Sequence, residues 1–156
     1  IEDLRRVLDE VEDDAVGVYG ASFGGLVAIH TAVRDDRIDA LALRDPVTFM
    51  EALDDIREEI REQGYYEQLP GKRVDERFLE DLEQYSTATI IGRLQVPTLV
   101  MHGTEDEVVD VELSERFVER LTCVKRFDVF EGEGHRFSDE ADDEAVLTAL
   151  DWFASH

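Results

Sequence analysis

A serine flanked by glycines stands near the start of the chain, in the run Gly20-Ala21-Ser22-Phe23-Gly24. The run follows an apolar stretch, Ala15 to Tyr19, and precedes a helix-like stretch, so Ser22 falls on a turn between a buried strand and a helix. Such a turn crowds the side chains two positions away, and we expect Gly20 and Gly24 to relieve that crowding. The hydroxyl of Ser22 would then project over the end of the sheet, beside backbone N–H groups that can hold a negative oxygen.

A serine hydroxyl is a weak nucleophile, so it needs a base, and the base needs a group that fixes its tautomer. Asp106 follows the strand-like run Thr98 to His102, and His135 follows the run Arg126 to Phe130. Ligands of open parallel sheets lie at the carboxyl ends of the strands. We therefore predict that Ser22, Asp106 and His135 meet at that edge.

Other acidic residues could take the role of Asp106. Glu105 and Asp110 lie in the same turn, and Asp45 follows another strand-like run. We favour Asp106 because a glycine ends its strand and the Val108-Val109 pair would pack beneath it. Asp45 precedes a proline and can equally be a loop carboxylate.

The order of elements predicts an α/β fold, a mainly parallel sheet with helices on both faces. Apolar residues at strand spacing indicate four strands, at 15–19, 40–43, 98–102 and 126–130. Helical spacing indicates four helices, at 2–8, 23–33, 111–121 and 142–153. These elements would position the three candidate side chains within a single domain spanning residues 1–156.

Residues 50–94 form an insertion that is too long for a simple crossover. Apolar residues at helical spacing indicate two amphipathic helices there, punctuated by Gly64 and Pro70-Gly71. We expect a small helical cap over the end of the sheet. Tyr65 and Tyr66 could line an acyl pocket in this cap, although adjacent aromatic residues more often anchor a helix end to a core.

The motifs around Ser22, Asp106 and His135, in that order along the chain, resemble those of the α/β-hydrolase superfamily. Prolyl-oligopeptidase-like and dienelactone-hydrolase-like esterases look most similar. The resemblance implies that Ser22 is the nucleophile, His135 the general base and Asp106 the orienting acid, with the N–H of Phe23 as one oxyanion-hole donor. It implies hydrolysis of an ester or similar acyl bond in a small molecule, without a cofactor or metal. Peptidase and thioesterase activities are the alternatives within this class.

The chain departs from this superfamily upstream of Ser22. Relatives place several strands there, with a loop that supplies the second oxyanion donor, whereas only one helix is predicted here. We therefore expect an open edge on the strand at 15–19, to be covered by a second copy of the chain or by an amino-terminal segment. An inactive hydrolase-fold module that serves association is the alternative function.

The charge balance is strongly acidic, with 39 Asp and Glu against 16 Lys and Arg and a net charge of −23. Nucleic acid is therefore a poor partner. The composition is similar to that of proteins from salt-loving archaea, where salt screens self-repulsion. No long apolar run or secretion signal is present, so we expect a soluble, cytoplasmic protein without a membrane segment. The single cysteine, Cys123, excludes an internal disulfide.

We predict that the fold is more stable in molar salt than in dilute buffer. The Debye length falls from about 10 Å at 0.1 M to about 3 Å at 1 M salt, which weakens repulsion among the carboxylates. Urea denaturation at both KCl concentrations measures this effect. An unchanged midpoint would contradict the interpretation of the chain as halophilic.

Overall fold

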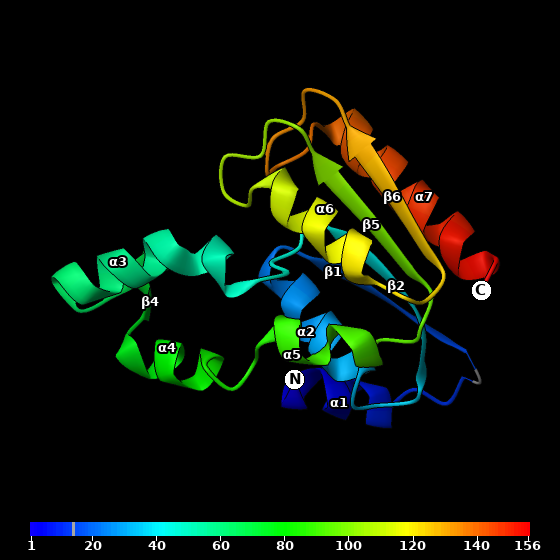
Figure 1. Ribbon diagram of the computed structural model, residues 1–156, viewed down its shortest axis with the longest axis horizontal. Helices are drawn as coiled ribbons and strands as arrows, with labels where there is room; N and C mark the ends of the chain where they lie inside the picture. The colour runs from blue at the N-terminus through cyan, green and yellow to red at the C-terminus, as the bar shows by residue number, and fades with distance from the viewer. Residues whose placement is uncertain (14) are drawn as a thin grey trace.

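A sheet of parallel strands forms the centre of the molecule (Figure 1). The computed structural model describes residues 1–13 and 15–156. The strands are adjacent in the order β1 (Val16–Ala21), β2 (Ile38–Arg44), β5 (Thr98–Gly103) and β6 (Lys125–Phe130). All four predicted strands are present, and their ends differ from the predicted ones by at most two residues.

Helices cover both faces of this sheet, as Figure 1 shows. On one face lie α1 (Glu2–Asp9), α2 (Phe23–Ala32) and α6 (Val111–Arg120), and on the other lies α7 (Asp139–Ala154). Side chains alternate along β2 because successive residues of a strand point to opposite faces. Leu41 and Leu43 pack with the first group, whereas Ala40 and Ala42 pack with α7. The predicted α/β class is confirmed.

Side-chain caps set where two of these helices begin. Ser138 accepts a hydrogen bond from the amide of Ala141 at 3.3 Å, so α7 starts at Asp139 rather than at the predicted Asp142. Asp110 caps α6 in the same way, through the amide of Glu112 at 2.9 Å. Such caps satisfy backbone donors that have no partner within the helix.

The insertion contains the two predicted helical regions and a hairpin that was not predicted. The first region is η1 (Met50–Leu53) followed by α3 (Asp54–Gln63), and the second is α4 (Glu76–Leu82). Between α3 and α4, strands β3 (Tyr66–Leu69) and β4 (Lys72–Val74) pair antiparallel. The strands of this hairpin are too short to show a clear alternation of apolar and polar residues, so the sequence indicated only its Pro-Gly turn. The helices of this region extend away from the sheet in Figure 1.

The last part of the insertion packs with the main core instead of with the cap. Here α5 (Thr87–Ile90) lies near α2 (Figure 1), and η2 (Ile91–Arg93) lies near α6. Ile90, Ile91 and Leu94 are buried in the same cluster as the core of the sheet. The segment outside the main core is therefore shorter than the predicted 50–94.

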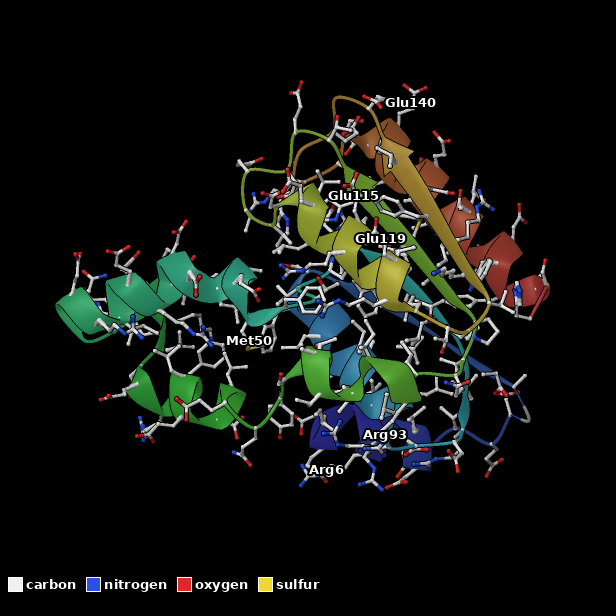
Figure 2. All side chains as sticks on the ribbon, in the orientation of Figure 1. Arg6, Met50, Arg93, Glu115, Glu119 and Glu140 are labelled. Carbon is white, nitrogen blue, oxygen red and sulfur yellow. The ribbon has the colours of Figure 1, made fainter. Side chains whose placement is uncertain are left out.

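The surface of the described chain has two further features. Along the sheet, β1 pairs only with β2, so its outer edge is open among the described residues. Acidic side chains such as Glu115, Glu119 and Glu140 project into solvent from the helices (Figure 2). Of the helices within the described residues, none combines the length and apolarity that crossing a membrane requires.

Candidate active site

Ser22 lies at the sharp turn between β1 and α2. Its backbone has φ 52° and ψ −125°, a positive-φ conformation outside the left-handed helical region that is strained for a residue with a side chain. Two hydrogen bonds hold the turn: the Ser22 amide donates to the carbonyl of Arg44, and the Val47 amide donates to the carbonyl of Ser22, each at 2.9 Å. The Ser22 hydroxyl makes no capping bond to α2. It is therefore available to a partner across the edge of the sheet.

Of the two glycines predicted to relieve crowding around Ser22, only Gly20 does so. A Cβ atom at Gly20 would stand 2.8 Å from the carbonyl oxygen of Gly24 and 3.1 Å from Cβ of Ala28, so Gly20 does relieve crowding. At Gly24 a Cβ would meet nothing within 4 Å, and the expectation of crowding there is wrong. Gly25 is the crowded position instead, because its Cβ would lie 2.5 Å from Cβ of Pro46.

The three predicted side chains form a continuous chain of hydrogen bonds. Nε2 of His135 lies 2.9 Å from Oγ of Ser22, and Nδ1 of His135 lies 2.8 Å from Oδ2 of Asp106. With a proton on Nδ1, His135 donates to the carboxylate and its Nε2 accepts from the hydroxyl. The arrangement can take a proton from Ser22 and stabilise the positive imidazolium that results.

The side chain of Asp106 is fully buried and accepts several hydrogen bonds. Its Oδ1 accepts from the amides of Val108 and Val109 at 2.8 and 2.9 Å. Burial raises the pKa of this carboxyl, but the bonds from His102, His135 and the two amides outweigh burial and hold the pKa well below its usual range. In turn the bond to Asp106 raises the pKa of His135 above its ordinary value of 6.5, against the opposing effect of the burial of the ring.

The imidazole ring of His102 contacts the carboxylate of Asp106 and helps to orient it. The ring is fully buried, with Nε2 at 2.9 Å from the carbonyl oxygen of Val109 and 3.2 Å from Oδ2 of Asp106. Its Nδ1 lies 2.8 Å from the hydroxyl of Ser114. A proton on Nε2 and a hydroxyl proton aimed at Nδ1 satisfy all of these contacts with a neutral ring.

Asp45 lies beside this hydrogen-bond chain but does not belong to it. Directly after β2 its φ is 44°, and Oδ1 accepts from the amide of Gly103 at 3.0 Å. Burial raises the pKa of Asp45 to about 6, although the Gly103 amide and His102 lower it. The candidate ligand atoms of Asp45, Asp106 and His135 all lie within 4.8 Å of one another. Of the two carboxylates, only Asp106 is hydrogen-bonded to His135.

The same cluster could be considered as a metal site because it contains two carboxylates and an imidazole. The 2.8 Å between Nδ1 of His135 and Oδ2 of Asp106 is a hydrogen-bond length. A tetrahedral zinc ion about 2 Å from both atoms would hold them about 3.3 Å apart, so they would have to separate. The geometry fits a shared proton better than a shared ion.

Backbone contacts between two loops fix the position of His135 relative to Asp106. The amide of Glu105 donates to the carbonyl of Glu133 at 2.9 Å, and the amide of Gly132 donates to the hydroxyl of Thr104 at 2.8 Å. A Cβ at Gly103 would overlap the carbonyl oxygen of Glu133. The prediction treated Gly103 as the end of a strand, but it also allows the two loops to touch.

A cavity of about 590 Å³ opens beside Ser22 and His135. Apolar side chains from α2, the cap and the loops after β2 and β5 form much of its wall, including Phe23, Val47, Leu53, Ile56, Phe78 and Val108. Tyr66 lines this cavity, whereas Tyr65 lies under the guanidinium of Arg73, 4.3 Å from the ring centre. A second cavity of similar volume lies between β6 and α7 and contains neither Ser22 nor His135.

The amide of Phe23 is the first of α2 and therefore has no acceptor within the helix. This is the position that the sequence predicted for an oxyanion donor. The cationic residues of the cavity, Lys72, Arg73 and Arg136, were not predicted as site residues. Arg136 could have been considered because it adjoins His135, but Lys72 depends on the unpredicted hairpin.

Comparison with known proteins gives a family match over nearly the whole chain. The sequence model of the prolyl oligopeptidase family matches residues 7–156. An uncharacterized protein of Mycobacterium tuberculosis is 29% identical over 141 residues, which are 90% of this chain and 45% of that protein. A mitochondrial palmitoyl-protein thioesterase of Mus musculus is 24% identical over 164 residues, 96% of this chain and 55% of that one. The chain spans about half the length of these curated relatives.

Solved structures of low sequence identity share the fold. A monoacylglycerol lipase of Paleococcus ferrophilus superposes with a TM-score of 0.74 and 18% identity, covering 99% of this chain and 74% of that one. The mouse alpha/beta hydrolase domain-containing protein 10 gives a TM-score of 0.79 and 20% identity, covering 96% and 66%. These similarities show the α/β-hydrolase fold.

The two glycines that flank Ser22 make a matched pair of substitutions. We expect Gly20→Ala to lower the free energy of unfolding by about 1–3 kcal/mol, because the added methyl group must displace backbone. Gly24→Ala should change it by no more than about 1 kcal/mol, and in the stabilising direction, because the space is open and the residue is helical. Urea unfolding measures both. Equal destabilisation would show that the turn is crowded on both sides.

Proposed function

The chain belongs to the prolyl oligopeptidase family, and we propose that it carries the catalytic site of a serine hydrolase that cleaves an ester or related acyl bond. The observation that supports this most strongly is the unbroken chain of hydrogen bonds from Ser22 through His135 to Asp106, of 2.9 and 2.8 Å. The strained conformation of Ser22 supports it independently, because strain of this kind is retained where function requires it.

In the proposed reaction, Oγ of Ser22 attacks the carbonyl carbon of the substrate while Nε2 of His135 takes its proton. The carbonyl π electrons move to the oxygen, and the amide of Phe23 donates a hydrogen bond to the resulting oxyanion. The carbonyl re-forms as the bond to the leaving group breaks, and His135 returns its proton to that group. Water then attacks the acyl-enzyme by the same steps and releases the acid.

Asp106 serves this reaction through His135. Its carboxylate keeps the proton on Nδ1, so that Nε2 faces Ser22 as an acceptor, and it stabilises the imidazolium electrostatically. The bonds from His102 and from two backbone amides hold the carboxylate in place. An apolar cavity wall beside Ser22 favours acyl substrates with a hydrocarbon portion.

Labelling with a fluorophosphonate tests the nucleophile. We expect the probe to modify Ser22 alone, because the protein offers this hydroxyl a base at 2.9 Å. Ser22→Ala should abolish labelling. Ser155→Ala, which removes an exposed hydroxyl at the carboxyl end of α7, should leave labelling intact. Labelling of Ser22→Ala at the unaltered rate would disprove the proposal.

The two buried carboxylates near His135 should differ strongly in their effect on turnover. Asp106→Asn presents an amide to Nδ1 and favours the wrong tautomer, so we expect kcat to fall roughly 10³–10⁴-fold. Asp45→Asn keeps an oxygen for the amide of Gly103 and should cost less than about tenfold, because Asp45 does not bond to the ring. Steady-state kinetics on both variants measures this. Reversed effects would assign the orienting role to Asp45.

The pH dependence should report on His135. The base must be neutral to accept a proton, and Asp106 raises the pKa of His135 above 6.5. We therefore expect kcat/KM to fall as the pH drops, with an apparent pKa above 6.5. Since the charge of Asp45 also raises the pKa of the ring, Asp45→Asn should move this limb to lower pH. A rate that stays flat from pH 5 to 8 would exclude His135 as the base.

A further inference from the structure

The cavity beside Ser22 carries an excess of positive charge. Lys72, Arg73 and Arg136 line it, and Glu107 is the single acidic residue among its lining residues. The whole chain has the opposite balance, with 39 acidic and 16 basic residues, and only two of the basic residues are lysines. The wall of the cavity therefore reverses the charge of the protein around it.

Two of these cations have no side-chain partner among the residues that the structure describes. No ion pair or hydrogen bond of the Lys72 ammonium or the Arg136 guanidinium is present within residues 1–13 and 15–156. Arg73 differs, because it is paired with Glu67 and lies 4.3 Å from the ring centre of Tyr65. In a chain with 39 acidic residues, most basic side chains have a carboxylate near enough to pair with. Lys72 and Arg136 are not paired in this way among the described residues.

The two cations reach the cavity from different parts of the fold. Lys72 starts β4 in the cap hairpin, directly after Gly71, whose φ of 75° makes the tight turn. Arg136 follows His135 in the loop after β6. Both side chains belong to exposed residues, so they lie at the rim of the cavity, while apolar side chains such as Val47 and Leu53 lie deeper.

We propose that this cavity selects acyl substrates that carry an anionic group on an apolar chain, with Lys72 and Arg136 as the residues that recognise the anion. This inference rests on the proposed function, because it places the scissile carbonyl at Ser22. The apolar wall would hold the chain, and the two rim cations would bind the anion by charge-assisted hydrogen bonds. Glu107 opposes the anion, which leaves a net positive wall.

Equilibrium binding to the Ser22→Ala protein tests this without catalysis. The probes are monomethyl adipate, which ends in a carboxylate, and methyl hexanoate, which has a similar chain and no charge. At 0.1 M KCl we expect the adipate ester to bind at least about fivefold more tightly, measured by NMR titration, since exposed ion pairs contribute little each but two act together. Hexyl phosphate is a third probe, and tighter binding than that of the adipate ester would identify phosphate as the preferred anion.

Charge-matched variants separate local recognition from the overall charge. Lys72→Gln and Arg136→Gln should each reduce the preference for the anionic ester by about two- to fivefold. Arg6→Gln changes the net charge equally, but Arg6 projects into solvent from α1 (Figure 2) and should leave the preference unchanged. Equal binding of the two esters, absence of binding by the anionic ester, or equal effects of all three variants would overturn the inference. Labelling of Ser22 is independent of these outcomes, so the proposed function can stand if the inference fails.

Discussion

The site depends on one constraint: the four parallel strands end side by side at the same edge of the sheet. The register pairs Ala21 with Arg44, Arg44 with Met101, and Gly103 with Phe130, so the loops after β1, β2, β5 and β6 leave the sheet side by side. Residues up to 113 positions apart in the chain can then touch without a dedicated scaffold. Ser22 and Asp45 directly follow β1 and β2. Both have positive φ, because the chain must turn sharply where each of these strands ends. The strain at these two positions is offset by the core that fixes the strands.

The carboxylates of Asp45 and Asp106 both lie at this edge of the sheet, and their different surroundings shift their pKa values in opposite directions. Asp106 receives hydrogen bonds from two amides and two imidazoles, which hold its pKa well below its usual range, so its negative charge is available to His135 at neutral pH. Asp45 receives one amide bond, its side chain is as buried as that of Asp106, and its pKa is raised to about 6. The contrast shows that hydrogen bonds to the charged form, more than burial, decide which carboxylate can support a positive ring. Asp45 instead ties the end of β5 to the end of β2 through Gly103.

The sequence was sufficient to predict the sheet, its helices and the meeting of Ser22, Asp106 and His135, because all of these follow from short-range patterns and from the alignment of parallel strand ends. It was insufficient where a tertiary contact decides the role of a residue. The crowding at Gly25 depends on Pro46 across the turn, and the contact at Gly103 depends on a loop thirty residues away. The hairpin was not predicted for a different reason. Its strands of four and three residues are too short to show the alternation of apolar and polar residues, so the position of Lys72 could not be predicted.

The charges of the surface and of the cavity act over different distances. Carboxylates such as Glu115 and Glu140 lie on the outer faces of helices and contribute to a field that repels anions. At 0.1 M salt this field is screened within about 10 Å, so it matters while a ligand approaches and much less once the ligand is inside the cavity. Of the charged residues that line it, Arg73 is paired with Glu67, and the charges of Lys72, Arg136 and Glu107 sum to a positive value. Molar salt would remove most of the long-range repulsion while contacts of hydrogen-bond length are screened least, so an acidic surface and a cationic cavity are compatible in one protein.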